Sequence, residues 1–597
     1  NYIFNLPWAV GFVIISRNIN TMRDGAMFHV KNHKQLNIVD PWAHLGPKRR
    51  KLLDSSWAGL FQQHILPQLP VESLRRHYHD CHGRPTKELY AMMGLMVLQQ
   101  MHDYTDREAV EQFCFNIQWH YALNITAASD TVAYISHKTL WTMRDHLATD
   151  ESYTEIFESS LQILATLFKA DLSRQRMDSV HVKSNMRNLG RIGLFVRTIK
   201  KFLVNLKRHH RDLFDQLDQP LTERYLSTSQ ASLFAMVKPT ESSRTLDQLA
   251  EDVLLLTERF AAVPEVGGMQ SFKLLVRLFA EQCVIEEEAT AASGKKAVAR
   301  PNKDVSSDSL QNPSDPDAGY SSHKGQGYQV QVVESFTTTD DQGPALITRV
   351  AVESADQHDA NALLPALEQL ARQEMLPREL LADSLYGSDS NCETAMQEHQ
   401  VEVVAPALPG NQKKFHLAEF TLDDQGRILT CPQGTAPDAV KKSTSGYSAV
   451  FPMAVCLACP VFDQCPVSKG KKACYYRYTD KDIRLARRRK EEDSPTFREK
   501  YRYRAGVEAT MSEFDRRTGV KHLRVRGMKA VRFAAIMKAI GLNILRASRH
   551  RGRKNTPRGP HQGFLWLLLA GWSLFKELVG QRSRKIVAMR QLSHLSA

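Results

Sequence analysis

Three acidic residues, far apart in the sequence, stand where a carboxylate could reach a ligand. Asp178 lies in the strand-like run SRQRMDSVHVK, Asp383 follows the apolar part of ELLADSLYG, and Glu508 lies in the helical run YRYRAGVEATMSEF. A carboxylate at a strand end projects from the sheet into a ligand site. Two such carboxylates and one from a packed helix offer the oxygen ligands that Mg²⁺ prefers, and two ions held there could clamp a phosphoryl transfer. Each acid alone is more often a turn, cap or ion-pair residue, so the prediction of a two-metal site depends on the combination.

The helix that carries Glu508 adds candidate DNA contacts. Tyr501, Arg504 and Glu508 are spaced three and four residues apart, which places them on one face of a helix. Arg504 could hold a phosphate with two parallel hydrogen bonds, and Tyr501 could pack on a sugar or base. Basic runs with interleaved aromatic residues surround this helix and favour contact with a nucleic-acid backbone over a merely solvated face. The candidate phosphate contacts beyond the helix face are Arg516, Arg517, Lys521, Arg524 and Arg526.

Composition agrees with a nucleic-acid partner. The chain has 597 residues with 79 Lys and Arg against 65 Asp and Glu, a formal charge of +14. Hydrophobic residues make up 42%, which is too many for a disordered chain, and the glycine content excludes collagen. At ~150 residues per domain, the length suggests four structural units. The longest apolar runs fall far short of a membrane span, so we expect no membrane partner.

The elements that must position the acids form an α/β pattern. The strand of Asp178 is followed, after a long interval, by two strand-like runs, GYQVQVVES and ALITRVAVES, joined by a turn-rich segment. A helix over 359–372, the strand before Asp383, a helix over 390–399 and the strand VEVVAP come next. This order predicts a mixed sheet flanked by helices.

Helical patterns precede and interrupt this core. The runs TKELYAMMGLMVLQQMHD, DREAVEQFCF and SHKTLWTMRDHL predict short helices that suit either a DNA-binding bundle or an adaptor and oligomerisation module. Residues 292–318 are polar and rich in Ser, Pro and Lys, and are predicted to be a linker. The expected domains are an extension that could include untranslated upstream sequence (1–53), a helical DNA-binding domain (54–150), the first part of the core (171–189), a helical insert with its linker (190–318), the continued core (319–408), a Cys-rich insert (409–483), C-terminal core helices (484–550) and a basic and apolar tail (551–597).

The nine cysteines are odd in number and mostly scattered, which does not fit a secreted disulfide framework and indicates an intracellular protein. One cluster stands out. Cys431, Cys456, Cys459 and Cys465 could supply four thiolates to a structural Zn²⁺, although Cys474 makes the fourth ligand ambiguous. Reduced, buried thiols without a metal are the equal alternative.

Other motifs compete with these candidates. Asp315 and Asp317 in SDPDA could be a further metal or DNA contact, but a turn ahead of a strand is the more frequent use of such residues. The run HYHDCH (77–82) has several possible metal ligands and is more often a polar surface turn. No phosphate-binding Walker loop or dinucleotide fingerprint is present.

Taken together, the motifs resemble the DDE transposases of bacterial insertion sequences. The spacing Tyr-x2-Arg-x3-Glu, after Asp-bearing strands in this order, is similar to the family pattern. The segment GRPTKELYAMMGLMVLQQMHDYTDREAVEQFCFN resembles the InsH-type N-terminal domain, RMDSVHVKSN and ADSLYGS resemble the two Asp motifs, and YRYRAGVEATMSEFDRRTGVKHLRVRGMKAV resembles the Glu helix. DPDAGYSSHKGQGYQVQVVES and a similar Cys-rich insert also match, and the resemblance covers roughly residues 65–546.

The resemblance implies an RNase H-like catalytic core after an all-α N-terminal domain. Asp178, Asp383 and Glu508 would be the metal-binding triad, with Tyr501 and Arg504 contacting the DNA end. Many family members have Lys seven residues after the Glu, whereas this chain has Asp515 followed by Arg516, which could substitute.

The activity implied is cleavage and strand transfer of an insertion sequence, with two Mg²⁺ ions for which Mn²⁺ can substitute. Its partners would be the terminal inverted repeats and target DNA, bound by a homodimer in the synaptic complex, in the cytoplasm at the nucleoid. An inactive DNA-binding relative and a metal-dependent nuclease on the same fold are the alternatives.

Overall fold

The computed structural model describes most of the chain between its terminal segments, namely residues 28–35, 40–79, 82, 85–226, 237–287, 295–338, 343–408 and 415–555. Most of the predicted tail and the first half of the predicted extension lie outside these ranges. Within them, no helix is both long enough and apolar enough to cross a bilayer. The description below concerns residues up to Ala547, which form one compact unit.

The N-terminal region is helical, as the sequence predicts. Its central helix α4 is apolar on every face and is buried among the others, whereas α5 is amphipathic and begins with a capping box. In that box Thr105 Oγ1 accepts from Glu108 N–H and the Glu108 carboxylate accepts from Thr105 N–H. The α-helices are α2 (Gly46–Ser55), α3 (Trp57–Leu60), α4 (Leu89–Met101), α5 (Asp106–Phe115), α6 (Ile117–Ala122), α7 (Asp130–Ala133), α8 (His137–Thr149) and α9 (Ser152–Phe168).

A six-stranded mixed sheet forms the centre of the next region, with the order β6-β5-β1-β7-β8 and β4 beside the start of β5. The pairs β6·β5 and β5·β1 are antiparallel, and β7 and β8 run parallel to β1. This is the arrangement expected of an RNase H-like core, and the predicted α/β fold class is confirmed. The strands are β1 (Arg174–Lys183), β4 (Gly319–Ser321), β5 (Gly325–Ser335), β6 (Ile347–Ser354), β7 (Glu379–Leu381) and β8 (Glu402–Val404).

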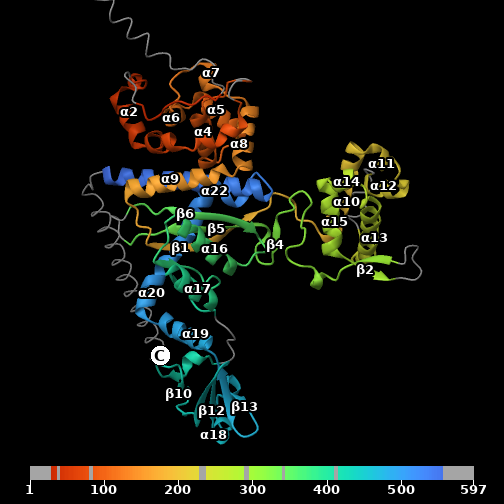
Figure 1. The fold of residues 1–597 in the computed structure, drawn as a ribbon, viewed down its shortest axis with the longest axis vertical. Helices are drawn as coiled ribbons and strands as arrows, with labels where there is room; N and C mark the ends of the chain where they lie inside the picture. The colour runs from red at the N-terminus through yellow and green to blue at the C-terminus, as the bar shows by residue number, and fades with distance from the viewer. Residues whose placement is uncertain are drawn as a thin grey trace, which may run out of the picture. The chain divides into compact units, whose positions relative to one another are not determined.

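Helices cover this sheet because its strands are apolar on both sides. Almost all of β5 is buried, which requires packing on each face. Helices α16 (Leu363–Arg372) and α17 (Asp389–His399) lie together beside the sheet (Figure 1), and α16 packs on β6. On the N-terminal side, α9 meets α22 (Met528–Asn555), where the Tyr153 and Phe533 rings are in edge-to-face contact with centroids 5.7 Å apart.

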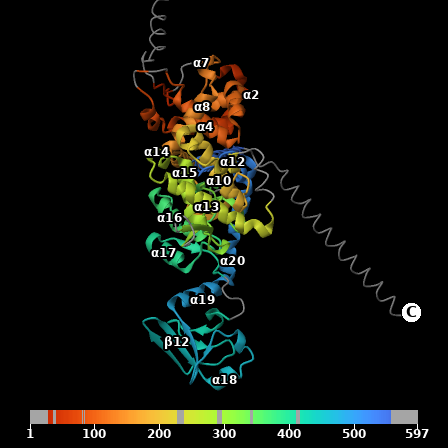
Figure 2. The same ribbon diagram turned by 90° about the vertical axis from the view of Figure 1, so that its right-hand side faces the viewer.

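The insert between β1 and β4 has a hydrophobic core of its own. Its long amphipathic helices α10, α13 and α15 run side by side (Figure 2). The elements are α10 (Arg191–His209), α11 (Arg211–Asp215), α12 (Gln219–Leu226), α13 (Ser242–Phe260), α14 (Pro264–Gly267), α15 (Gln270–Gln282), β2 (Cys283–Glu287) and β3 (Lys295–Ala299).

The prediction of a linker over 292–318 is wrong in its first part, because β3 lies there and pairs with β2. The two strands are antiparallel, and Glu286 stands opposite Lys296, an opposite-charge cross-strand pair that stabilises such ladders. Ala297 is fully buried in the core of the insert. A short strand of Lys and Ala has little apolar periodicity, so the pairing could not be read from its composition.

The Cys-rich region also has its own small core, which extends onto α19 (Asp480–Glu492) through Ile483 and Ala486. It contains a four-stranded antiparallel sheet in the order β11-β12-β14-β13 and a separate β9·β10 pair. The elements are β9 (Thr421–Leu422), β10 (Ile428–Thr430), β11 (Ala439–Ser443), β12 (Gly446–Phe451), α18 (Met453–Leu457), β13 (Ser468–Lys469) and β14 (Cys474–Tyr478).

The C-terminal helices return to the sheet in several pieces. The sequence predicts one helix face for Tyr501, Arg504 and Glu508; Arg504 and Glu508 do pair as i,i+4 neighbours, but the three residues belong to three successive helical segments. Tyr501 ends α20 (Pro495–Tyr501), Arg504 lies in a 3₁₀ turn (Arg502–Ala505), and Glu508 lies in α21 (Gly506–Thr518). Gly506 marks the break, where the chain changes helical type. The preceding helix is α19 (Asp480–Glu492), and α22 follows α21.

Candidate active site

The three predicted carboxylates converge on one guanidinium. Arg504 Nη2 lies 3.0 Å from Asp178 Oδ2 and 3.9 Å from Asp383 Oδ2, and Arg504 Nη1 lies 3.1 Å from Glu508 Oε1. The acids come from β1, from the loop after β7, and from α21. Residues more than 300 positions apart therefore form one cluster, in which a single cation offsets three negative charges.

The acids differ in exposure. The side chain of Asp178 is 17% exposed, that of Asp383 35% and that of Glu508 70%. Burial raises the pKa of Asp178 above its ordinary value, because the effect of Arg504 and of a hydrogen bond from Ser179 N–H is smaller than the cost of desolvation. The charges of Asp383 and Asp359 add to the increase. A cation bound beside Asp178 would therefore favour its ionised form.

The raised pKa of Asp178 predicts an effect of pH on stability. The folded chain protonates Asp178 at a higher pH than the unfolded chain does, so ionised Asp178 lowers the free energy of unfolding once the pH exceeds its unfolded pKa. In protein free of divalent ions, we expect Asp178→Asn to raise the melting temperature at neutral pH. The increase should vanish at a pH below both pKa values, where Asp178 is protonated in both states. Thermal melts at the two pH values test this, and an equal shift at both would contradict it.

A buried charge network holds α21 on the sheet. Glu334 on β5 is fully buried and stands opposite Arg176 of β1 in the ladder, with Arg176 Nε 2.7 Å from Glu334 Oε1. Thr510 Oγ1 donates to Glu334, and Arg546 Nη1 of α22 lies 2.8 Å from Glu334 Oε2. One carboxylate therefore ties two strands to α21 and α22, and so fixes the helix that carries Glu508.

The start of α21 approaches Arg176 so closely that it needs a glycine. Arg176 Nη1 donates to Tyr503 O at 2.7 Å, in the turn before α21. A Cβ on Gly506 would lie 2.1 Å from Arg176 Nη1, well inside van der Waals contact. The absence of a side chain at this position allows the turn that carries Arg504 to lie against the sheet.

An open cavity of about 680 Å³ extends from the acids. Asp178 and Glu508 are in its wall, and most of its other polar lining is cationic or imidazole. The residues that sequence reasoning missed are His181, Lys183, His323, Lys324 and His522, and Lys521 was predicted. His181 and Lys183 follow Asp178 in β1, and His323 and Lys324 form the β4–β5 turn. Their nearness to Asp178 in the sheet is the feature from which these residues could have been predicted.

The sequence analysis also missed Asp359 and Tyr386, which lie near Asp178. Asp359 follows β6 and accepts from Gln331 Nε2 at 3.0 Å, while Tyr386 O–H donates to Gln331 Oε1 at 2.6 Å. Both ring nitrogens of His181 are buried without a hydrogen-bond partner among the described residues. Burial, together with Lys324 and Lys183, lowers the pKa of His181, so the ring is neutral at pH 7 and can donate or accept a hydrogen bond.

The predicted DNA contacts lie in different places, some near the acids and some away from them. Tyr501 is half-buried, with its ring stacked on Phe497 at a centroid distance of 5.4 Å, next to the acids. Arg516 and Arg517 are exposed on α21, and Arg517 pairs with Glu513. Arg524 and Arg526 are not brought to the cavity. Arg524 pairs with Asp103 at 3.0 Å, which joins it to the N-terminal helices, and Arg526 Nη1 lies 3.3 Å from Met186 Sδ.

The rival motifs have structural uses. Asp315 is fully buried and accepts from Ser184 Oγ, Tyr328 O–H and Gly527 N–H. Asp317 accepts from the Met528 N–H at the start of α22. The turn ahead of β4 is present, since Ala318 N–H donates to Asp315 O at 3.3 Å, and the two carboxylates in addition hold distant segments together. In HYHDCH, His77 pairs with Asp150 and stacks on His146, while residues 80 and 81 lie outside the described part of the chain.

The carboxylate cluster has suitable donors for Mg²⁺, because hard oxygen ligands from three elements face one cation. That cation is Arg504. In the described part of the chain, no three His, Cys, Asp or Glu side chains stand close enough together to hold a metal ion. The acids therefore supply the type of ligand that Mg²⁺ requires. In this structure the Arg504 guanidinium lies between the three carboxylates and pairs with them.

Comparison with known families gives two matches. Residues 59–146 match the family described as Transposase domain (DUF772), and residues 430–547 match the family described as Transposase DDE domain. The first covers the N-terminal helices α4 to α8, and the second contains Arg504 and Glu508. No curated protein and no solved structure matches the chain. The two matches, one to an N-terminal transposase domain and one to a transposase DDE domain, support a DDE transposase.

Proposed function

We propose that this transposase cleaves DNA at the ends of a mobile element and joins the freed ends to target DNA, with Asp178, Asp383 and Glu508 as its catalytic acids. The observation that carries the proposal is the convergence of the three carboxylates on Arg504, two of them, Asp178 and Glu508, in the wall of a large cavity otherwise rich in Lys and His. Asp178 and Asp383 lie outside the two matched segments, so their assignment depends on this geometry.

The acids would hold two Mg²⁺ ions, for which Mn²⁺ can substitute. When bound, these ions stabilise the attacking and the leaving oxygen of a phosphoryl transfer. Arg504 would then exchange its carboxylate partners for a phosphate oxygen of the DNA, since a guanidinium binds both groups in the same two-pronged way. Tyr501, held beside the acids by Phe497, would pack on the terminal sugar or base.

In the first step a water oxygen would attack the phosphorus at the element's end, and the bond to the 3′-oxygen would break. The freed 3′-hydroxyl would attack a target phosphodiester in the second step, breaking one phosphorus–oxygen bond as it forms another. Most of the acceleration would come from positioning and from neutralised charge. Two ends must be held together for joining, so we propose that two chains act in one synaptic complex.

The cavity wall provides a test of the DNA path. Lys521 lines the cavity, whereas Arg524 is paired with Asp103. Each phosphate contact removed from duplex DNA reduces the salt slope of log K by about 0.9. We therefore expect Lys521→Ala to weaken DNA binding and to reduce that slope by about one, and Arg524→Ala to leave the slope unchanged. Fluorescence anisotropy over a salt series measures both, and a slope that changes with Arg524 alone would contradict the proposed path.

The activity itself is tested with a labelled duplex that carries the inverted repeat flanking the coding sequence. With Mg²⁺, the proposal predicts a nick or break at the repeat end and, with target DNA present, a joined product. Cleavage without joining would favour a nuclease. Specific binding without cleavage would favour an inactive DNA-binding relative.

A further inference from the structure

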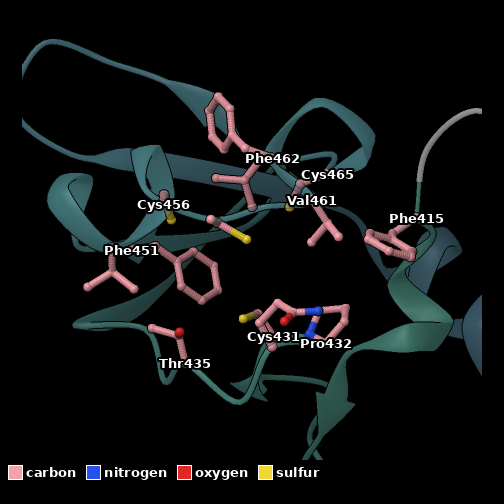
Figure 3. Close-up of a pocket in the computed structure, with 13 residues that line it drawn as sticks. Phe415, Cys431, Pro432, Thr435, Phe451, Cys456, Val461, Phe462 and Cys465 are labelled. Carbon is pink, nitrogen blue, oxygen red and sulfur yellow. The ribbon is translucent and has the colours of Figure 1, made fainter.

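The Cys-rich region places four thiols around one small cavity, far along the chain from the carboxylates. Five cysteines fall between residues 431 and 474, and all five are unpaired. Four of them line a cavity of about 30 Å³, namely Cys431, Cys456, Cys459 and Cys465. Figure 3 shows the sulfurs of Cys431, Cys456 and Cys465 around the same space. This volume is that of a single ion or water.

Tight turns hold the four cysteines in place. At the first turn, Gly434 N–H donates to Cys431 O at 2.9 Å, and Cys431 N–H donates to Thr435 O at 2.9 Å. Gly434 has a φ of +80°, a conformation that favours glycine. On the opposite side, Cys459 N–H donates to Cys456 O at 3.2 Å and Cys465 N–H donates to Phe462 O at 3.0 Å. Two separate segments therefore present cysteines from turns, each fixed by backbone hydrogen bonds.

Cys474 differs from these four in not lining the cavity, although its thiol is in hydrogen-bonding contact with that of Cys456. Cys474 begins β14 opposite Phe451 of β12 and is fully buried in the core of the region. Burial and the nearby thiols of Cys474, Cys465 and Cys431 raise the pKa of Cys456 to about 12. These cysteines are thus close enough to Cys456 to interact with it.

The other groups in the cavity wall decide which cation would suit it. No Asp, Glu or His lines it, and most of the remaining wall is apolar, including Phe415, Phe451 and Phe462. Magnesium and calcium need oxygen ligands, which the side chains here do not supply. Zinc binds four thiolates in a tetrahedral site, and closed sites of this kind hold small folds together.

We propose that Cys431, Cys456, Cys459 and Cys465 bind one structural zinc ion. Since no three donors of the described residues now stand at ligating distance, the thiols must rotate about χ1 into the cavity. Binding forms four Zn–S bonds and releases four protons to solvent, which leaves a site of charge −2. The ion would join the turn after β10 to α18, and through the shared core it would stabilise the start of α19.

The experiment uses the full chain purified with zinc in the medium, and its zinc content is measured by inductively coupled plasma mass spectrometry. We expect one zinc per chain in the native protein and a loss of most of it in Cys459→Ser. Two matched controls, Cys474→Ser and Cys392→Ser, should keep it, and so should Asp178→Asn, which separates this site from the catalytic one. Metal-free native protein, or equal zinc in Cys459→Ser, would overturn the proposal. Loss of zinc only in Cys474→Ser would overturn the ligand assignment.

A second measurement removes the dependence on folding of the variants. Zinc is withdrawn from the native chain with a chelator and replaced by Co²⁺, whose spectrum reports its ligands. Four thiolates should give strong sulfur-to-cobalt charge transfer and the visible bands of tetrahedral cobalt, and zinc should displace them. A spectrum typical of octahedral oxygen ligation would contradict the thiolate site.

Discussion

Glu508→Gln is expected to abolish DNA strand cleavage while DNA binding persists. The substitution keeps the size of the side chain and its place on α21, but removes the charge that a divalent ion needs. Losing several kcal/mol of transition-state stabilisation corresponds to a decrease of roughly 1,000-fold or more in the cleavage rate, since each 1.36 kcal/mol is tenfold. Asp178→Asn and Asp383→Asn should act in the same way. Single-turnover cleavage of a labelled repeat end measures the rate, and anisotropy measures binding.

The matched control is Glu499→Gln. Glu499 is an exposed carboxylate on α20 that lies 3.9 Å from Arg502. Glu499→Gln therefore removes the same charge from a nearby segment without changing the carboxylate cluster. It should cleave at the native rate. Unimpaired cleavage by Glu508→Gln, or by either aspartate variant, would refute the assignment of the catalytic acids.

The second large effect concerns stability. Glu334→Ala should lower the free energy of unfolding by about 3–5 kcal/mol, because it leaves one buried guanidinium group without a carboxylate and a second with Glu513 as its remaining carboxylate partner. Those groups belong to Arg176 and Arg546, whose side chains are each 11% exposed, and Thr510 loses its acceptor as well. The urea midpoint, followed by circular dichroism, measures the loss.

Two control variants test whether the loss of stability comes from the buried charge network. Glu334→Gln keeps an acceptor for Thr510 and should cost less than the alanine variant. Glu499→Ala removes a surface ion pair and should change stability by less than about 1 kcal/mol. If Glu334→Ala unfolded at the same urea concentration as Glu499→Ala, the network would not be what fixes α21 on the sheet.

The sequence predicts the core well because its signals are local. Apolar strands bounded by turns indicated the order of β1, β5, β6, β7 and β8, and Asp178 and Asp383 stood out because one lies within a strand and the other just after one. The helical periodicity of the N-terminal region and of the insert is equally local. What the pattern could not show was the short 3₁₀ turn over Arg502–Ala505, between the helix that ends at Tyr501 and the helix that begins at Gly506.

Contacts between distant segments were beyond prediction. The pairing of Arg524 with Asp103 joins residues 421 positions apart, and in the sequence Arg524 is indistinguishable from its basic neighbours. The same holds for Arg504, which appeared as a phosphate ligand and is found as the common partner of three acids. A charged side chain shows its partner only once the fold has brought the two together, so long-range electrostatics is what sequence patterns leave out.

The central claim is that Asp178, Asp383 and Glu508 gather to bind divalent ions. Anomalous diffraction from crystals grown with Mn²⁺ and the repeat-end DNA tests it most directly, since the ions themselves are located. We predict anomalous peaks in contact with the Asp178 and Asp383 carboxylates, with the Arg504 guanidinium withdrawn from them. Saturating Mn²⁺ with no peak there, and with all three acids still paired to Arg504, would contradict the account.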